Sequence, residues 1–109
     1  MESLKAALLQ LKPAGTIEEN LQKGLAACRK AREMGADIAL FPEMWSVGYQ
    51  IPENVEELKK MAVPAEGDFV QAYQKLAREL DMAVAVTILE AWEPLPRNTV
   101  ILINRYGHK

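Results

Sequence analysis

The sequence predicts an α/β fold built around one mixed sheet. Short apolar segments typical of buried strands alternate with amphipathic segments of helical periodicity, in the order β-α-β-α-α-β-β. The last two apolar segments are joined by a short turn without a helix, so they should pair antiparallel, whereas the first two should be parallel. A chain of 109 residues is long enough for one domain, which we take as residues 1–109.

The first β-α-β unit extends over residues 4–41. Residues 4–11 are apolar and end before Pro13, as expected for a buried strand. Thr16 should begin a helix, because Glu19 follows at the spacing of a capping box, and Gly35 should end it. The segment 36–41 is a second buried strand, which Pro42 terminates because proline has no N–H to donate.

The remaining elements follow a loop at residues 42–53. A short helix capped by Asn54 is expected first, and then an amphipathic helix over residues 68–81. Strands are predicted at 82–90 and 99–104, with a turn between them that contains Arg97, Asn98 and Thr99. The four strands are nearly continuous apolar runs, which is typical of strands covered on both faces.

Composition excludes several classes of function. The net charge of −2 offers no basic excess to neutralise phosphates, so no nucleic-acid partner is expected. No apolar run approaches the ~18 residues of a membrane span. The single cysteine, Cys28, forms no internal disulfide, and a cytoplasmic location is expected. The only histidine, His108, has no metal-type neighbours, so neither a metal nor a cofactor is expected.

Glu43 is the candidate catalytic residue, because it lies two residues beyond the carboxyl end of a predicted strand. Ligands of open α/β sheets bind at such ends. Phe41, Met44 and Trp45 should partly desolvate the carboxylate, which would suit a general base. The alternative is a solvated loop acid. Trp45 and Tyr49 either line a substrate pocket or pack on the strand ends.

Two further residues have a structural alternative to a chemical role. Glu90 ends the predicted strand 82–90, so its carboxylate could approach the same sheet edge as Glu43 or serve in hydrogen bonding within the fold. Cys28 falls on the inward face of the first helix, where a thiol is usually a small inert hydrophobe.

Four segments of the chain resemble the N-terminal part of the carbon–nitrogen hydrolase (nitrilase) superfamily. They are "AALLQLKP", "EENLQKGLAACRKAREMGADIALFPEMWSVGY", "AVAVTILE" and "RNTVILINRYG". The most specific piece is "GADIALFPE…GY" in the second segment, which combines a helix stop, a strand, the Pro–Glu step and a Gly–Tyr pair. The resemblance implies a partial α-β-β-α sandwich with its helices on one face of the sheet. It also implies that Glu43 is the glutamate of a Glu-Lys-Cys mechanism that hydrolyses amides, nitriles or N-carbamoyl compounds.

The chain departs from the family pattern after Gly107. The family's lysine follows several residues beyond such a glycine, and its cysteine lies further on, whereas here only His108 and Lys109 remain. We therefore interpret residues 1–109 as a truncated, N-terminal portion of a carbon–nitrogen hydrolase domain and expect the chain alone to be inactive. Its partners would be a small amide or nitrile substrate in the full-length protein and, because the second sheet is missing, other copies of itself.

Two alternatives to an enzyme fragment remain open. The first is a non-catalytic interaction or assembly module that retains the first half of the fold. The second is an unrelated β-α-β binder of small molecules, which is disfavoured because "LKPAGT" after the first strand is not a Gly-rich phosphate loop. An in-frame continuation carrying a Tyr-Arg-Lys motif and a later cysteine would favour the enzyme fragment, and a stop codon would favour the module.

Overall fold

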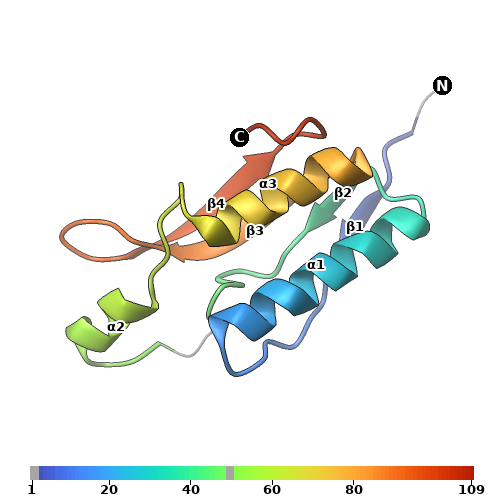
Figure 1. The fold of residues 1–109 in the computed structure, drawn as a ribbon. Helices are drawn as coiled ribbons and strands as arrows, with labels where there is room; N and C mark the ends of the chain where they lie inside the picture. The colour runs from blue at the N-terminus through green and yellow to red at the C-terminus, as the bar shows by residue number, and fades with distance from the viewer. Residues whose placement is uncertain (1–2, 49–50) are drawn as a thin grey trace.

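The computed structural model describes residues 3–48 and 51–109. Its elements follow the predicted order (Figure 1): β1 (Ala6–Leu8), α1 (Ile17–Glu33), β2 (Ile38–Leu40), α2 (Val55–Met61), α3 (Asp68–Leu80), β3 (Ala83–Glu90) and β4 (Arg97–Ile103). Three strands differ from their predicted bounds in ways that matter for the site. β1 and β2 are only three residues long, and β4 begins at Arg97, so Asn98 and Thr99 belong to a strand and not to the turn.

The four strands form one mixed sheet in the order β1-β2-β3-β4. β1, β2 and β3 are parallel, and β4 is antiparallel to β3, as the short connection predicted. The register aligns Leu8, Leu40, Ala85 and Leu102 in one row across the sheet. Side chains alternate between the two faces along a strand, so all four project to the same side.

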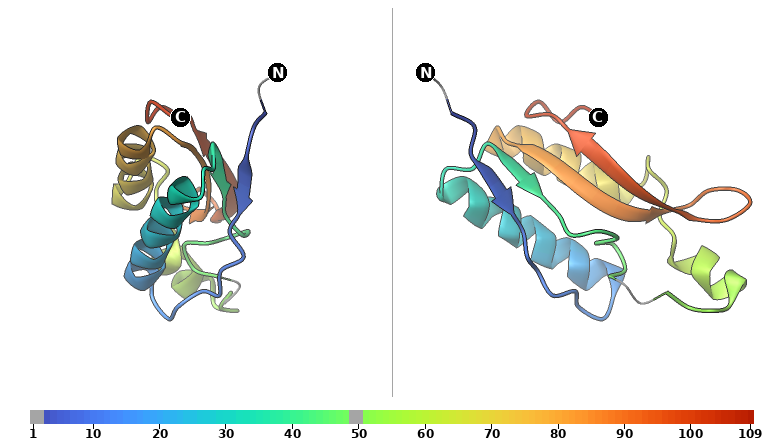
Figure 2. Two further views of the ribbon diagram at one scale, coloured as in Figure 1. Left: turned by 90° about the vertical axis from the view of Figure 1, so that its right-hand side faces the viewer. Right: turned by 180° about the vertical axis from the view of Figure 1, so that it is seen from behind.

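Both long helices, α1 and α3, cover the same face of the sheet (Figure 2). The main core lies between them and the sheet, and it includes Ala39, Val84, Val86, Ile88, Ile101 and Ile103 from the strands. Phe41, Trp45, Phe69 and Tyr73 add the aromatic part of this core. The predicted single-faced arrangement of the helices is confirmed.

None of the described helices covers the opposite side of the sheet, which we call the open face. It carries the residues that alternate with the core positions, namely Leu8, Leu40, Ala85, Thr87, Val100 and Leu102. At its outer strands the apolar side chains are in contact with solvent: Leu8 is 67% exposed, Val100 63% and Leu102 60%. A continuous apolar row across a bare sheet is a surface that another layer of protein would normally cover.

The predicted signals at the ends of α1 are confirmed. The Thr16 hydroxyl accepts a hydrogen bond from the Glu19 N–H at 3.1 Å and donates to Glu19 Oε1 at 2.9 Å. At the other end Gly35 adopts a left-handed φ of +91°, which a glycine tolerates without strain. Helical periodicity alone would place Met34 on the same inward face as Cys28, but α1 ends at Glu33 and Met34 is 74% exposed beyond it.

Candidate active site

The turn that follows β2 carries Glu43 along the edge of β3. β2 ends at Leu40, yet the chain stays beside β3, and the Phe41 N–H donates to the Ala85 carbonyl at 3.1 Å. Met44 then adopts a left-handed φ of 55°, and its carbonyl accepts hydrogen bonds from the N–H groups of Val47 (3.1 Å) and Gly48 (2.7 Å). This reversal sends the chain back under the helices and leaves the Pro42–Glu43 step at the corner.

Two buried hydroxyl groups fasten this turn to the sheet. Thr87 Oγ1, on β3, accepts from the Trp45 N–H at 2.9 Å and donates to the Pro42 carbonyl. Ser46 Oγ accepts from the Leu89 N–H at 3.0 Å. Side chains therefore replace part of the ladder that β3 would otherwise make to a longer β2. The backbone on both sides of Glu43 is fixed by bonds to one strand.

Glu43 lies at the open face, in a hollow lined by Phe41, Thr87, Asn98 and Val100. Its Oε1 accepts a hydrogen bond from Asn98 Nδ2, which comes from β4. The carboxylate itself is exposed. The partial desolvation expected from its apolar neighbours is therefore wrong within residues 3–48 and 51–109, because Phe41, Met44 and Trp45 are buried while the Glu43 carboxylate stays exposed.

Trp45 does not line the hollow around Glu43. Its indole is 1% exposed and packs in the core, where Nε1 donates to the Asn20 carbonyl of α1 at 3.0 Å. The ring centroid lies 5.7 Å from that of Phe41. Of the two interpretations of Trp45, packing at the strand end is the one that the structure shows. Tyr49, the other candidate for substrate binding, lies outside the described residues.

Glu90 lies on the other face of the sheet from Glu43. Its Oε1 accepts hydrogen bonds from Arg97 Nε and Thr99 Oγ1, both at 2.8 Å. Along β4 these two residues alternate with Asn98, the partner of Glu43. The sequence left open whether Glu90 could approach the edge occupied by Glu43. The structure shows that it instead takes part in hydrogen bonding across the β3–β4 hairpin.

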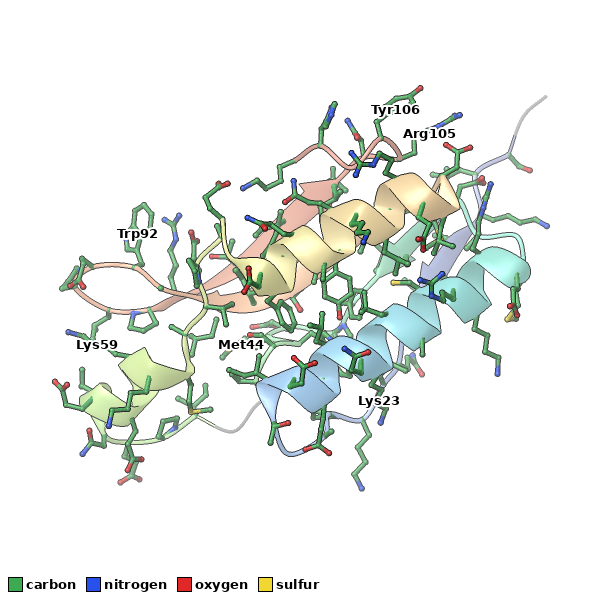
Figure 3. All side chains as sticks on the ribbon, viewed as in Figure 1. Lys23, Met44, Lys59, Trp92, Arg105 and Tyr106 are labelled. Carbon is green, nitrogen blue, oxygen red and sulfur yellow. The ribbon has the colours of Figure 1, made fainter. Side chains whose placement is uncertain are left out.

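The hydrogen bond from Arg97 holds the pKa of the Glu90 carboxyl below its usual range, with Thr99 acting in the same direction and burial opposing both. Arg97 in turn lies over the Trp92 ring, with its guanidinium carbon 3.5 Å from the ring centroid. Trp92 projects at the hairpin end, away from the helices, as Figure 3 shows. The hairpin thus has its own polar and aromatic contacts, separate from the core.

Glu90→Gln should be less stable than the wild type at neutral pH by about 1 kcal/mol, because Arg97 is half exposed and the pair is partly screened. A carboxyl whose pKa is lowered by folding stabilises the fold above its unfolded pKa and loses that contribution as pH falls. Urea denaturation from pH 7 to pH 3 should show the gap between the two proteins closing below about pH 4.5. A gap of constant size would contradict the assignment.

The remaining candidates take no part in the hollow at Glu43. Cys28 is fully buried in α1, and desolvation raises the pKa of its thiol to about 12, as expected for an inert core residue. His108 is exposed and uses its backbone N–H to bond Asn104 Oδ1 at 3.0 Å. Lys109 Nζ pairs with Glu66 Oε1 near the start of α3.

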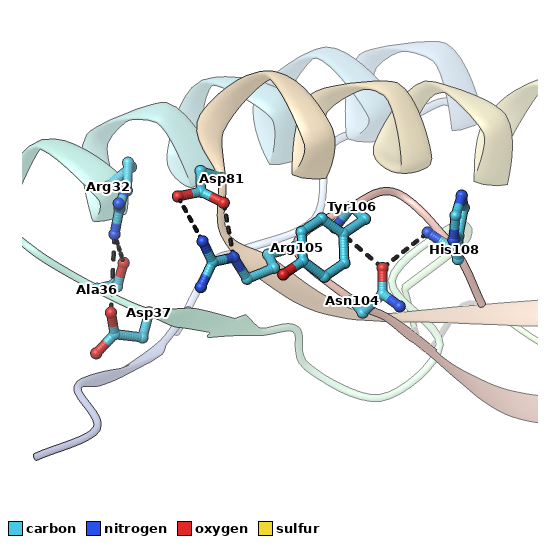
Figure 4. A network of polar contacts seen from close by, with 8 residues as sticks. All are labelled: Arg32, Ala36, Asp37, Asp81, Asn104, Arg105, Tyr106 and His108. Atoms are coloured by element: carbon cyan, nitrogen blue, oxygen red, sulfur yellow. Dashed lines mark hydrogen bonds and ion pairs between the residues drawn. The ribbon is translucent and has the colours of Figure 1, made fainter. Parts of the chain in front are cut away.

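A second polar cluster lies at the opposite end of the sheet, where the parallel strands begin (Figure 4). Arg105 Nε bonds Asp81 Oδ1 at 2.8 Å, and Arg32 Nη1 lies 3.8 Å from Asp37 Oδ1. These side chains are partly or largely exposed, and each is paired with a side chain of opposite charge, as is typical of a solvated rim.

Within residues 3–48 and 51–109, no group of three or more His, Cys, Asp or Glu side chains could hold a metal ion.

Three polar residues of the site escaped the sequence analysis. Thr87 could have been noticed as the one hydroxyl inside the apolar run "AVAVTILE". Asn98 was assigned to a turn, and nothing in the local sequence shows that it lies within a strand. Ser46 gave no signal at all, because its role depends on a contact with β3, 43 residues away.

Among the described helices, none has the length and apolar character that crossing a bilayer requires.

Comparison with known proteins identifies the family. The family model for carbon–nitrogen hydrolases matches residues 5–109. A glutamine-dependent NAD(+) synthetase from Thermotoga maritima is 31% identical over 94 residues, which is 85% of this chain and 16% of that protein. The chain thus spans a small part of this relative.

Solved structures agree with this result at the level of the fold. A carbon–nitrogen hydrolase from Helicobacter pylori G27 matches with a TM-score of 0.80 at 14% identity, over 95% of this chain and 36% of that one. The NitFhit protein of Caenorhabditis elegans matches with a TM-score of 0.77 at 21% identity, over 94% and 25%. An amidase from Nesterenkonia sp. matches with a TM-score of 0.71 at 20% identity, over 96% and 40%. The chain belongs to the carbon–nitrogen hydrolase family and has the fold of the N-terminal part of its domain.

Proposed function

We propose that this chain supplies the general base, Glu43, to an enzyme that hydrolyses carbon–nitrogen bonds other than peptide bonds. The observation that carries the proposal is the placement of one carboxylate. Glu43 lies at the carboxyl end of β2, on the open face, at a corner that Thr87 and Ser46 tie to β3. The carboxylate faces the side of the sheet on which the rest of a larger domain would pack.

In the proposed reaction the thiol is supplied by the part of the domain beyond this chain. Glu43 takes the thiol proton, and the thiolate attacks the carbonyl carbon of an amide, forming a carbon–sulfur bond. The carbon–nitrogen bond then breaks, the proton returns from Glu43 to the departing amine, and a thioester remains. Water, losing a proton to Glu43, releases the acid and restores the thiol. A lysine from the same missing part would stabilise the oxyanion.

The substrate class follows from what related proteins bind. One solved structure of the Nesterenkonia amidase is a complex of a double mutant with acrylamide, and another shows acrylamide added to the active-site cysteine. The Thermotoga relative is named as glutamine-dependent. These support a small primary amide as the first substrate to test. The alternative function is a non-catalytic assembly module, which the apolar open face would also suit.

The test uses the protein expressed from its complete reading frame, assayed for ammonia release from acrylamide, glutamine, nitriles and N-carbamoyl compounds. We expect amide hydrolysis, and Glu43→Gln should reduce it by about 10²- to 10⁴-fold, the usual contribution of a general base, without loss of folding. Glu33→Gln is the matched control, because it removes an exposed carboxylate from the opposite end of the sheet.

Two outcomes would contradict the proposal. Hydrolysis that survives Glu43→Gln at near wild-type rate would remove Glu43 from the mechanism. A folded wild-type protein that is inactive toward the whole panel would favour the assembly module. The circular dichroism spectrum and Tm of each variant show whether a loss of rate reflects chemistry or unfolding.

A further inference from the structure

We propose that Asn98 is a positioning residue for Glu43, holding the carboxylate in the orientation that proton transfer requires. The proposal rests on the proposed role of Glu43 as the general base. It starts from one contact between residues 55 positions apart in the sequence: Asn98 Nδ2 donates a hydrogen bond to Glu43 Oε1. Within the described residues, this side-chain hydrogen bond joins β4 to the Glu43 carboxylate.

The sheet register determines that Asn98 faces Glu43. Asn98 is paired with Leu89 in the antiparallel ladder. The residues on either side of it in β4, Arg97 and Thr99, bond Glu90 on the helix-covered face. Because side chains alternate along a strand, Asn98 must project to the open face. It arrives there beside Thr87 and Val100, which line the same hollow. At the Asn98 end, the contact therefore follows from strand pairing and not from a loop conformation.

The chemistry of the contact suits a base. An ionised carboxylate can only accept hydrogen bonds, so the amide nitrogen of Asn98, and not its oxygen, must face Glu43. The amide is neutral, so it orients the carboxylate without forming an ion pair that would compete for the proton. The bond engages Oε1, which leaves Oε2 as the atom that takes the proton from the nucleophile.

Both ends of the contact are anchored independently. The backbone on either side of Glu43 is tied to β3 through Thr87 and Ser46, and Asn98 lies within the paired part of β4. The hydrogen bond between the side chains removes the remaining rotation of the carboxylate. Loss of such a constraint typically misplaces the reacting group by a fraction of an ångström to about 1 Å, which can reduce the rate by as much as about 10²-fold.

The contact is tested first without an assay of activity. In the ¹⁵N-labelled protein expressed from its complete reading frame, Glu43→Gln should shift the side-chain amide signals of Asn98 more than those of Asn104, which lies at the far end of β4. A spectrum in which the Asn98 signals do not move would overturn the proposal, whatever the enzyme does.

The kinetic test separates positioning from general stability. Asn98→Asp keeps the shape but removes the donor, and Asn98→Leu removes it without adding charge. Each should lower kcat by about 10- to 100-fold with little change in KM. Asn104→Asp is the control, because Asn104 Oδ1 only accepts, from the Tyr106 and His108 N–H groups, and aspartate can do the same. It should retain the wild-type kcat.

A double-mutant cycle completes the test. Adding Asn98→Leu to Glu43→Gln should cost almost nothing further in kcat, because Asn98 acts through Glu43. Independent, multiplicative losses would overturn the proposal. If Glu43→Gln alone leaves kcat unchanged, it is the proposed function that fails. If Glu43→Gln abolishes activity while Asn98→Asp and Asn98→Leu leave it intact, this inference fails and the proposed function stands.

Discussion

Gly24→Ala is expected to destabilise the fold by about 3 kcal/mol, although alanine is the better helix former by about 1 kcal/mol. Gly24 lies in α1 where three aromatic side chains pack against the helix. A Cβ there would lie 2.1 Å from Tyr73 Oη, 2.7 Å from Trp45 Nε1 and 2.9 Å from Phe41 Cε1. All three rings belong to the core and cannot move aside without disturbing it.

The missing side chain also protects two hydrogen bonds. Trp45 Nε1 donates to the Asn20 carbonyl at 3.0 Å, and Tyr73 Oη donates to the Leu21 carbonyl at 3.3 Å, both one turn before Gly24. A methyl group would displace both donors, and a buried donor without a partner costs about 1–3 kcal/mol. The expected loss is a large fraction of the stability of a small domain.

Thermal denaturation followed by circular dichroism would measure the effect. A loss of about 3 kcal/mol should lower Tm by about 12–24 °C. Gly15→Ala is the matched control, since the nearest atom to its added Cβ is Glu19 Oε1 at 3.9 Å, and it should change stability by less than about 0.5 kcal/mol. An increase in stability for Gly24→Ala would mean that the aromatic packing around α1 is wrong.

Leu102→Lys is expected to weaken self-association of the 109-residue chain by at least about tenfold. The open face presents Leu8, Leu40, Ala85 and Leu102 in one row, and in the chain by itself a second copy is the partner available to cover it. Full burial of a leucine contributes about 1.5–3 kcal/mol, and 1.4 kcal/mol corresponds to tenfold in a dissociation constant. A lysine within such a contact would also bring a charge out of water.

Sedimentation velocity over a range of concentrations would measure this change. The wild-type chain should sediment as a dimer or larger species at tens of micromolar, and Leu102→Lys should move the distribution toward the monomer. Met34→Lys is the control, because Met34 is equally apolar and 74% exposed but lies beyond α1, away from the open face. A wild-type chain that remains monomeric would show that the open face does not mediate association.

The sequence predicted the order of the elements and the family with little loss, because both depend on local patterns. Helical periodicity, the Thr16 cap and Gly35 define α1, and the Pro42–Glu43 step is recognisable in the chain itself. The strand lengths were less accurate. β2 ends early because the chain leaves the ladder where Thr87 and Ser46 begin to substitute for it, and no local signal marks that change.

The surroundings of Glu43 depended on contacts that no local pattern contains. Its apolar neighbours in the sequence suggested a desolvated carboxylate, but Trp45 turns into the core and Glu43 stays exposed. Asn98 meets Glu43 only because β4 begins two residues earlier than its composition suggests. The first error concerns the path of the chain through the turn at Met44, and the second concerns the pairing of β4 with β3.

The pairing of β4 with β3 gives the carboxylates of Glu90 and Glu43 hydrogen-bond donors of different charge. Arg97 and Asn98 are neighbours in β4. The guanidinium of Arg97 bonds Glu90, and the neutral amide of Asn98 bonds Glu43. A slip of a single residue in the pairing would exchange them, because every side chain of the strand would change faces. Glu90 would then lose its counter-ion, and Glu43 would gain one. The pairing of one hairpin thus decides which of two chemically identical groups has a cationic partner in the fold and which has a neutral one.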